Sequence, residues 1–219
     1  MTKVFKPCQV MVLIGGNGSN LQALMDNAPG AHYQIAGVIS HRPDVYGLIR
    51  AEQGQIPHTV VDHTRYEDRF EFEKNLIQVI DEYRPDLIVL AGFMRILSGD
   101  FTLNYPHKIL NIHPALLPKY KGLKTHQRVL EAKDPNHGAS VHYVTPMLDS
   151  GGIIAQARLL VHPQDTAETL LNRVHRAEHW LYPKVVNWYA QKRLTYDGLT
   201  VSFDDLPLPE TGKVFDMDF

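Results

Sequence analysis

The sequence predicts an α/β fold built on a mostly parallel but mixed sheet. Short apolar runs at residues 9–14 and 87–90 are typical of buried parallel strands. Between them, residues 67–83 have the pattern of an amphipathic helix, as a crossover between parallel strands requires. Further on, strand-like segments at residues 139–144 and 153–161 are joined by a short loop, so we expect these two strands to be antiparallel neighbours.

Length and composition limit the classes of protein to consider. The chain has 219 residues, of which 44% are apolar and 21% charged, with a net charge of −2. We expect a single domain over residues 1–219, with an N-terminal lobe of about residues 1–105 and a C-terminal lobe of about residues 106–219. A slightly negative net charge is not typical of a protein that binds nucleic acid, and no apolar run reaches the roughly 20 residues of a membrane span. Small-molecule partners are therefore expected, with a monomer or a homodimer both open.

The single cysteine, Cys8, excludes an internal disulfide and suits a reducing compartment. Residues 1–7 lack the apolar core of a secretory signal. Together these features predict a cytoplasmic protein.

The first strand is followed by a glycine-rich turn at residues 15–20 and then by a helix with Leu21, Leu24 and Met25 at helical spacing. Strand, turn and helix in this order aim free backbone N–H groups at an anion. A dinucleotide-binding turn would need a glycine at Leu21, and no acid follows the second strand at residues 34–40. The turn thus favours one small phosphate over NAD. Two alternatives stay open, namely NADP through Arg42 and a plain βα turn.

The middle of the chain continues the alternation. We expect a helix at residues 44–53, a strand at 58–61, the helix at 67–83, the central strand at 87–90 and a short helix at 99–104. The long helix is predicted to bury one apolar stripe, formed by Phe70, Phe72, Leu76, Ile77 and Ile80. The apolar loop at residues 91–97 ends a buried strand, so it must pack or line a pocket.

The strand at residues 109–113 carries the strongest chemical signal. Asn111 and His113 are two residues apart, so they share one face of the strand. Pro114 cannot continue a central ladder, so the strand is predicted to end at His113. Ligands of open α/β sheets bind at the carboxyl ends of strands. The alternative is a core histidine beside a capping asparagine.

Beyond residue 122 we expect a helix at residues 125–132, a turn at 134–138 and the two antiparallel strands. Ser140 and His142 share one face of the first of these strands. Asp165 or Thr166 is predicted to cap a last helix that runs to about residue 191. Residues from 194 onward resemble a peripheral hairpin and tail.

Asn111, His113 and Asp149 together suit transfer of an acyl-type group. An asparagine amide can donate to a developing oxyanion, and a histidine can shuttle protons near neutral pH. An aspartate nearby favours the charged imidazolium. No serine or cysteine nucleophile accompanies them, so we expect no acyl-enzyme. Because the imidazole and the amide already supply proton transfer and oxyanion donation, we expect that no metal is required.

One competing motif is His175-Arg-Ala-Glu178-His179, which matches the H-x-x-E-H pattern of inverted zinc proteases. A five-residue match arises often by chance, and a third zinc ligand is not evident. A polar helix face is the other interpretation.

The chain resembles the family of phosphoribosylglycinamide formyltransferases over residues 11 to about 188. Four stretches carry the resemblance: Gly16-Asn-Gly-Ser-Asn20-Leu-Gln22, Ala91-Gly-Phe-Met-Arg-Ile-Leu97, Asn111-Ile-His113-Pro-Ala-Leu-Leu-Pro118-Lys-Tyr, and His137-Gly-Ala-Ser-Val-His142 with Asp149. The Asn-x-His-Pro pattern with the following Leu-Leu-Pro is shared by folate formyltransferases. The glycine turn is specific to the glycinamide branch.

The resemblance implies a Rossmann-like, formyltransferase-type mixed sheet with helices on both faces, and formyl transfer from 10-formyltetrahydrofolate to the glycinamide amine in purine biosynthesis. It implies Asn111, His113 and Asp149 as catalytic residues. The ribonucleotide site that it implies consists of Gly18, Ser19, Asn20, His175, Arg176, Ala177 and Glu178. The folate site that it implies consists of Arg69, Met94, Arg95, Ile96, Leu97, Asn111, Thr145, Pro146, Met147, Leu148 and Asp149.

Gly15 and Ser150 depart from the family pattern, which has another small residue at the first position and a glycine pair directly after Asp149. Two other functions stay open. A formyltetrahydrofolate hydrolase would use the same three residues with water as acceptor, although residues 1–7 leave no room for the regulatory domain usual in that family. A non-catalytic nucleotide-binding module would need only the glycine turn.

Overall fold

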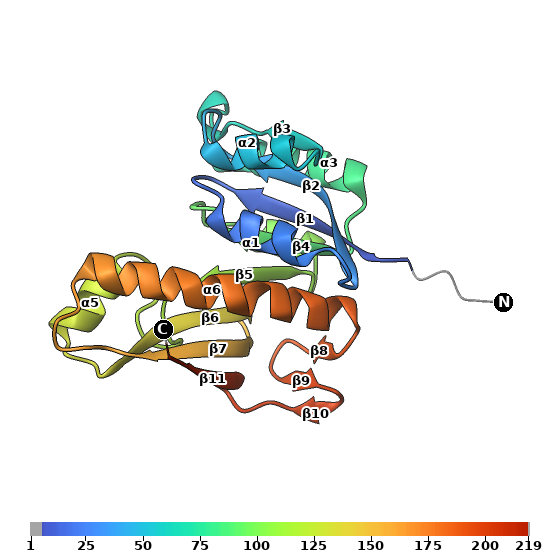
Figure 1. Cartoon of the computed structure of the whole chain (residues 1–219). Helices are drawn as coiled ribbons and strands as arrows, with labels where there is room; N and C mark the ends of the chain where they lie inside the picture. Colours follow the sequence, from blue (N-terminus) through green and yellow to red (C-terminus); the bar gives the residue numbers. More distant parts are fainter. Residues whose placement is uncertain (1–5, 219) are drawn as a thin grey trace.

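The computed structural model describes residues 6–218. Residues 1–5 and 219 lie outside it, and with them most of the N-terminal stretch used to argue against a secretory signal. The described chain forms one eight-stranded sheet, in the order β11-β7-β6-β5-β4-β1-β2-β3, and a small three-stranded sheet (Figure 1). None of its helices is long and apolar enough to cross a membrane.

The main sheet is mixed and mostly parallel, as predicted. Parallel pairing joins β1 to β2 and β4, β2 to β3, β4 to β5, and β7 to β11. Antiparallel pairing joins β6 to both β5 and β7. The strands of this sheet are β1 (Cys8–Ile14), β2 (Tyr33–Ser40), β3 (His58–Val60), β4 (Leu87–Ala91), β5 (Ile109–His113), β6 (Asn136–Tyr143), β7 (Ile153–Leu160) and β11 (Lys213–Met217).

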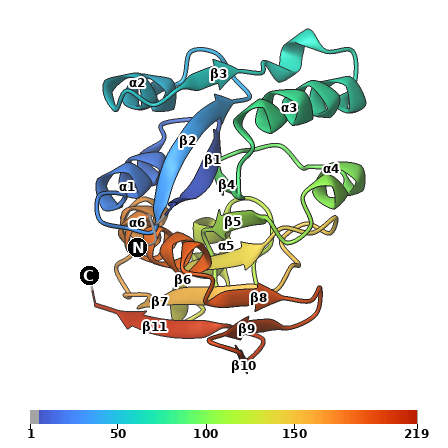
Figure 2. The same cartoon turned by 90° about the vertical axis from the view of Figure 1, so that its right-hand side faces the viewer.

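Helices cover both faces of the sheet (Figure 2). On one face Leu24 of α1 and Leu181 of α6 share a core with Val10 and Val12 of β1. On the other face α3 and α4 share a second core with Met11 of the same strand, because successive strand residues point to opposite faces. The helices are α1 (Ser19–Asn27), α2 (Tyr46–Gln53), α3 (Arg69–Tyr83), α4 (Gly99–Asn104), α5 (Thr125–Glu131) and α6 (Ala167–Ala190), with a 3-10 turn η1 (His63–Arg65).

The stripe predicted for α3 is narrower than expected. Phe72, Leu76 and Ile80 are buried, but Phe70 is 68% exposed. Two residues correspond to about 200° of turn on an α-helix, so Phe70 and Phe72 cannot both face the core. Asp68 caps this helix by accepting a hydrogen bond from the Glu71 N–H at 2.9 Å.

Two predictions for the second half of the chain were wrong. The turn expected at residues 134–138 is partly strand, because β6 begins at Asn136. A Cβ at Gly138 would lie 1.9 Å from the Ala157 carbonyl oxygen, so this glycine permits close strand pairing and does not mark a turn. The hairpin predicted from residue 194 is present, but the tail that follows it is not peripheral. After β8 (Leu194–Tyr196), β9 (Val201–Phe203) and β10 (Leu206–Pro207), β11 joins the main sheet, and Phe215 packs edge-on against Trp180.

The strand order places the predicted site. The chain runs outward from β1 to β3, returns to β4 on the other side of β1, and continues to β5. The strand order thus reverses at the neighbouring strands β1 and β4, and ligands of open α/β sheets bind at the carboxyl ends of strands at such a reversal. The glycine turn, the loop after β4 and the end of β5 all lie at that edge.

Candidate active site

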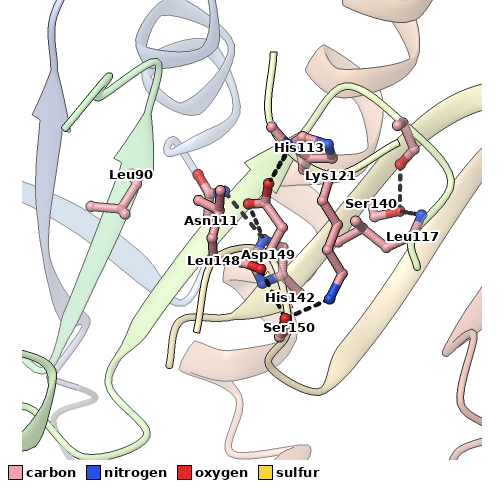
Figure 3. A network of polar contacts seen from close by, with 12 residues as sticks. Leu90, Asn111, His113, Leu117, Lys121, Ser140, His142, Leu148, Asp149 and Ser150 are labelled. Atoms are coloured by element: carbon pink, nitrogen blue, oxygen red, sulfur yellow. Dashed lines mark hydrogen bonds and ion pairs between the residues drawn. The ribbon is translucent and has the colours of Figure 1, made fainter. Parts of the chain in front are cut away.

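The catalytic candidates gather where β5 lies between β4 and β6. Asn111 pairs with His142 in the antiparallel ladder, so their side chains lie on the same face. The Asn111 Nδ2 atom is 3.2 Å from His142 Nε2 (Figure 3). Sequence reasoning assigned no role to His142. His142 shares a strand face with Ser140 and lies in the stretch His137–His142, and this was the sequence signal that could have identified it.

His113 is buried, with 5% of its surface exposed, and both of its ring nitrogens have neighbours. Nε2 lies 2.9 Å from the Tyr120 carbonyl oxygen, which can only accept, so Nε2 carries a hydrogen. Nδ1 lies 3.4 Å from Asp149 Oδ2 (Figure 3). In the neutral ring Nδ1 would present a lone pair to this carboxylate. The pair is therefore attractive only when His113 is an imidazolium.

Asp149 reaches His113 from the loop between β6 and β7. Its backbone is in the left-handed region, with φ 45°, and its Oδ2 accepts a hydrogen bond from the Gly122 N–H at 2.9 Å. The neighbouring Ser150, a departure from the family pattern, accepts from Lys121 Nζ at 2.5 Å and donates to the Leu148 carbonyl at 2.8 Å. The loop is thus fastened to the segment after His113.

His142 is held neutral. Burial is the main cause that lowers its pKa to about 4, against the Tyr143 carbonyl and Asp149, which raise it. Nδ1–H donates to the Tyr143 carbonyl at 2.8 Å, so the bare Nε2 accepts from Asn111. The 3.7 Å approach of Nε2 to Asp149 Oδ1 is then no ion pair. Asn111 Nδ2 carries two hydrogens. One is donated to His142 Nε2, and within residues 6–218 the other has no acceptor.

The turn that follows His113 is pinned from β6 and β7. The Ser140 hydroxyl donates to the Ala115 carbonyl at 2.6 Å and accepts from the Leu117 N–H at 3.0 Å. Gln156 Nε2 contacts both the Ser140 hydroxyl and the Leu117 carbonyl, at 2.9 and 2.8 Å. This buried network keeps the backbone after the strand in one conformation.

The glycine turn forms the second part of the site. Gly18, with φ 75°, is the N-cap of α1 and gives the helix no side-chain cap, so its first N–H groups remain open to a ligand. Gly15 also has a packing reason, because a Cβ there would lie 1.8 Å from His41 Cε1. Asn20 Nδ2 donates to Glu178 Oε2 at 2.9 Å, although the two residues are 158 positions apart.

Glu178 is 4% exposed, and burial raises its pKa to about 7, against the Asn20 hydrogen bond, which lowers it. The half-buried His175 lies one turn earlier on α6, and burial lowers its pKa. Arg176 is exposed, whereas the side chain of Ala177 is fully buried in the core. No group of three or more His, Cys, Asp or Glu side chains within residues 6–218 is placed to hold a metal ion, so the zinc interpretation of H-x-x-E-H gains no support.

The third part of the site is apolar and exposed. Met94 and Ile96 in the loop after β4 are 70% and 60% exposed, while Leu97 is buried. Met147 and Leu148 in the loop after β6 are 71% and 49% exposed. The two loops meet, since a Cβ at Gly99 would lie 3.7 Å from Pro146. Arg95 is exposed beside Met94, and the Thr145 hydroxyl bridges its own loop by donating to the Met147 carbonyl at 3.3 Å.

Arg69 adjoins this surface through Glu73. Its Nε lies 2.9 Å from Glu73 Oε1, and the same carboxylate accepts from the Ser98 N–H at 2.8 Å and from the Ser98 hydroxyl. The structure therefore links Arg69, at the start of α3, to the end of the apolar loop.

The chain is similar to known proteins over most of its length. The formyl transferase family model matches residues 8–186. Phosphoribosylglycinamide formyltransferase of Escherichia coli is 43% identical over 209 residues, covering 94% of this chain and 99% of the relative. The human trifunctional purine biosynthetic protein adenosine-3 is 44% identical over 187 residues, which cover 84% of this chain and 18% of that protein.

A solved structure of the phosphoribosylglycinamide formyltransferase from Coxiella burnetii superimposes with a TM-score of 0.93 at 50% identity, covering 96% of this chain and all of that one. Sheet order, family match and relatives agree, and the chain belongs to the formyl transferase family.

Proposed function

We propose that this chain transfers the formyl group of 10-formyltetrahydrofolate to the amine of 5-phosphoribosylglycinamide, giving the N-formyl product, as a cytoplasmic enzyme of purine biosynthesis. The observation that carries the proposal is the cluster of Asn111, the buried His113 and Asp149 at the carboxyl end of β5. It lies in a chain that matches relatives bearing the name of this activity over 94% of its length.

The chemistry needs donors for an oxyanion and a proton for the leaving group. The glycinamide amine adds to the formyl carbon, and the carbonyl oxygen becomes negatively charged. The second N–H of Asn111 is available to that oxygen. A protonated His113 supplies a second donor when its Nε2 exchanges the Tyr120 carbonyl for the substrate oxygen.

The intermediate then collapses, breaking the bond between the formyl carbon and the folate nitrogen. The attacking amine loses a proton and the folate nitrogen gains one, so no net proton is consumed. His113 would carry this proton, and the approach of Asp149 to its Nδ1 supports this role, because a nearby carboxylate favours the charged imidazolium.

The glycine turn and the facing part of α6 would hold the ribonucleotide. Open N–H groups at Gly18, Ser19 and Asn20 suit a phosphate at the start of α1. Glu178, already hydrogen-bonded to Asn20, would accept from hydroxyl or amine groups of the same substrate, and His175 and Arg176 flank it on α6.

The folate would lie on the apolar surface of Met94, Ile96, Met147 and Leu148. Exposed large apolar side chains at one place are costly unless something covers them, and a planar heterocycle fits that need. Arg69 and Arg95 are the cations proposed to border this site.

The test follows the folate absorbance change with the purified protein. With 10-formyltetrahydrofolate and glycinamide ribonucleotide together we expect turnover, and without the ribonucleotide we expect none. Turnover without the acceptor would indicate a hydrolase, and no turnover in either mixture would indicate a binding module.

A further inference from the structure

The glycine turn is held from the side by Arg50 of α2, a residue that neither the motifs nor the proposed substrate contacts include. Its Nε donates to the Asn17 carbonyl at 3.0 Å, and its Nη2 lies 3.1 Å from Asn17 Oδ1. Its Nη1 donates to Gln22 Oε1 at 3.0 Å. One guanidinium thus bonds the turn just before Gly18 and the helix just after it.

The backbone of α2 supports the same turn. The Gly47 N–H donates to the Gly16 carbonyl at 3.1 Å. A Cβ on Gly18 would lie 2.6 Å from Gly47 Cα, so the two glycines touch. The Arg50 guanidinium carbon in turn packs 4.8 Å from the Tyr46 ring centroid, one helical turn away. The first two turns of α2 therefore form a platform under the glycine turn.

Arg50 also keeps its charge unpaired. None of the ion pairs found within residues 6–218 includes it, and its hydrogen-bond acceptors are the uncharged Asn17 and Gln22. The Gln22 acceptor is itself oriented, because Gln22 Nε2 donates to Asp26 at 2.8 Å. By contrast, Arg158 on β7 has its charge neutralised by Asp216.

We infer that Arg50 is a positioning residue for the phosphate site: it holds the N–H groups of the glycine turn in place and adds an unneutralised positive charge beside them. The inference rests on the proposed function, because it requires that the ribonucleotide phosphate bind at this turn. A planar fork with three bonds cannot be reproduced by the single ammonium group of a lysine. Geometry and charge can therefore be separated by substitution.

The experiment compares wild type with Arg50→Lys and Arg50→Ala, using two acceptors: glycinamide ribonucleotide and the glycinamide riboside that lacks the phosphate. We expect kcat/KM for the ribonucleotide to fall about tenfold or more in Arg50→Lys and further in Arg50→Ala. With the riboside, and in the KM for the folate, both variants should match wild type. Arg158→Ala is the matched control. It removes an arginine of β7 that makes two hydrogen bonds to Asp216 and has no contact with the glycine turn, so it should behave as wild type.

Each other outcome has a definite meaning. Equal losses with ribonucleotide and riboside would show a general structural role and overturn the inference. Full activity in Arg50→Lys would show that charge alone matters and would overturn the positioning role. If wild type used both acceptors equally well, the phosphate site of the proposed function would fail, independently of Arg50.

Discussion

Two neighbouring regions of the candidate site differ in which side chains they bury. The end of β5 buries polar side chains, whereas the loops after β4 and β6 expose apolar ones. His113 and His142 are 5% and 2% exposed, yet they are polar. Met94 and Met147 are 70% and 71% exposed, yet they are apolar. Both arrangements reverse what a folded chain normally does, and they occur at adjoining places on one edge of the sheet.

The two reversals have different physical consequences. Buried polar groups must find partners, and here Tyr120, Asp149, Asn111 and Tyr143 supply them. Exposed apolar side chains find no such partners within the fold, and a cluster of them is typical of a surface that binds a ligand. The two buried histidines therefore have their partners before any substrate arrives, whereas Met94 and Met147 would gain theirs only from the proposed folate.

The largest effect is expected in the polar region. Asn111→Ala and His113→Ala should each reduce kcat by about 10²-fold or more, the usual scale for losing an oxyanion donor, with little change in either KM. Steady-state kinetics with both substrates measures this. Asn104→Ala and His58→Ala, at exposed positions, are the controls. A loss below tenfold in both active-site variants would remove the distinction between the two regions.

A smaller effect is expected in the apolar region, and on a different constant. Ile96→Asp should raise the KM for the folate about tenfold or more, because a charged side chain replaces apolar surface that the ligand would cover. The fold should survive, since Ile96 is 60% exposed. Leu103→Asp changes an apolar residue on α4 that is even more exposed, at 72%, and should leave the KM for the folate unchanged. An unaltered folate KM in Ile96→Asp would contradict the assignment.

A pH titration of stability probes the buried polar side chains without substrate. Burial lowers the pKa of His41, His126 and His142 to about 4 and that of His137 to about 3. Between these values and about 6.5 the unfolded chain binds more protons than the folded one, so the free energy of unfolding should fall as pH drops from 6.5 toward 4. Glu178 opposes the trend, because its raised pKa lets the folded state bind a proton between pH 4.5 and 7.

Urea unfolding at pH 7.0, 5.5 and 4.5 measures this dependence. His41→Gln, which removes one non-catalytic buried imidazole, should flatten the decline, whereas His58→Ala should not. A free energy of unfolding that stayed constant or rose toward pH 4.5 would mean that these histidines are not held neutral by the fold.

Periodicity and chain-breaking residues predicted much of this arrangement. The bounds of α4 and β5 matched residues 99–104 and 109–113, since Pro114 ends the strand and Ser98 caps the helix. The shared face of Asn111 and His113 followed from the two-residue repeat of a strand. These are local properties, and local sequence determines them.

What was missed depended on contacts between distant segments. His142 enters the cluster only through the register between β5 and β6, and the Tyr120 carbonyl only through the path of a loop. Strand β11 pairs with β7 in the main sheet, although its own residues follow a hairpin with no distinctive apolar run. Nothing in the sequence around Arg50 distinguishes it, because its three acceptors belong to Asn17 and Gln22, which only the fold brings close.

The claim that most needs testing is that Asp149 holds His113 as the charged donor of the polar region. Nitrogen-15 NMR of histidine-labelled protein at pH 7 reports directly which ring nitrogens carry hydrogen, in wild type and in Asp149→Asn. We predict hydrogen on both nitrogens of His113 in wild type and on Nε2 alone in the variant, while His142 stays neutral in both. The same protonation of His113 in the two proteins would contradict the account.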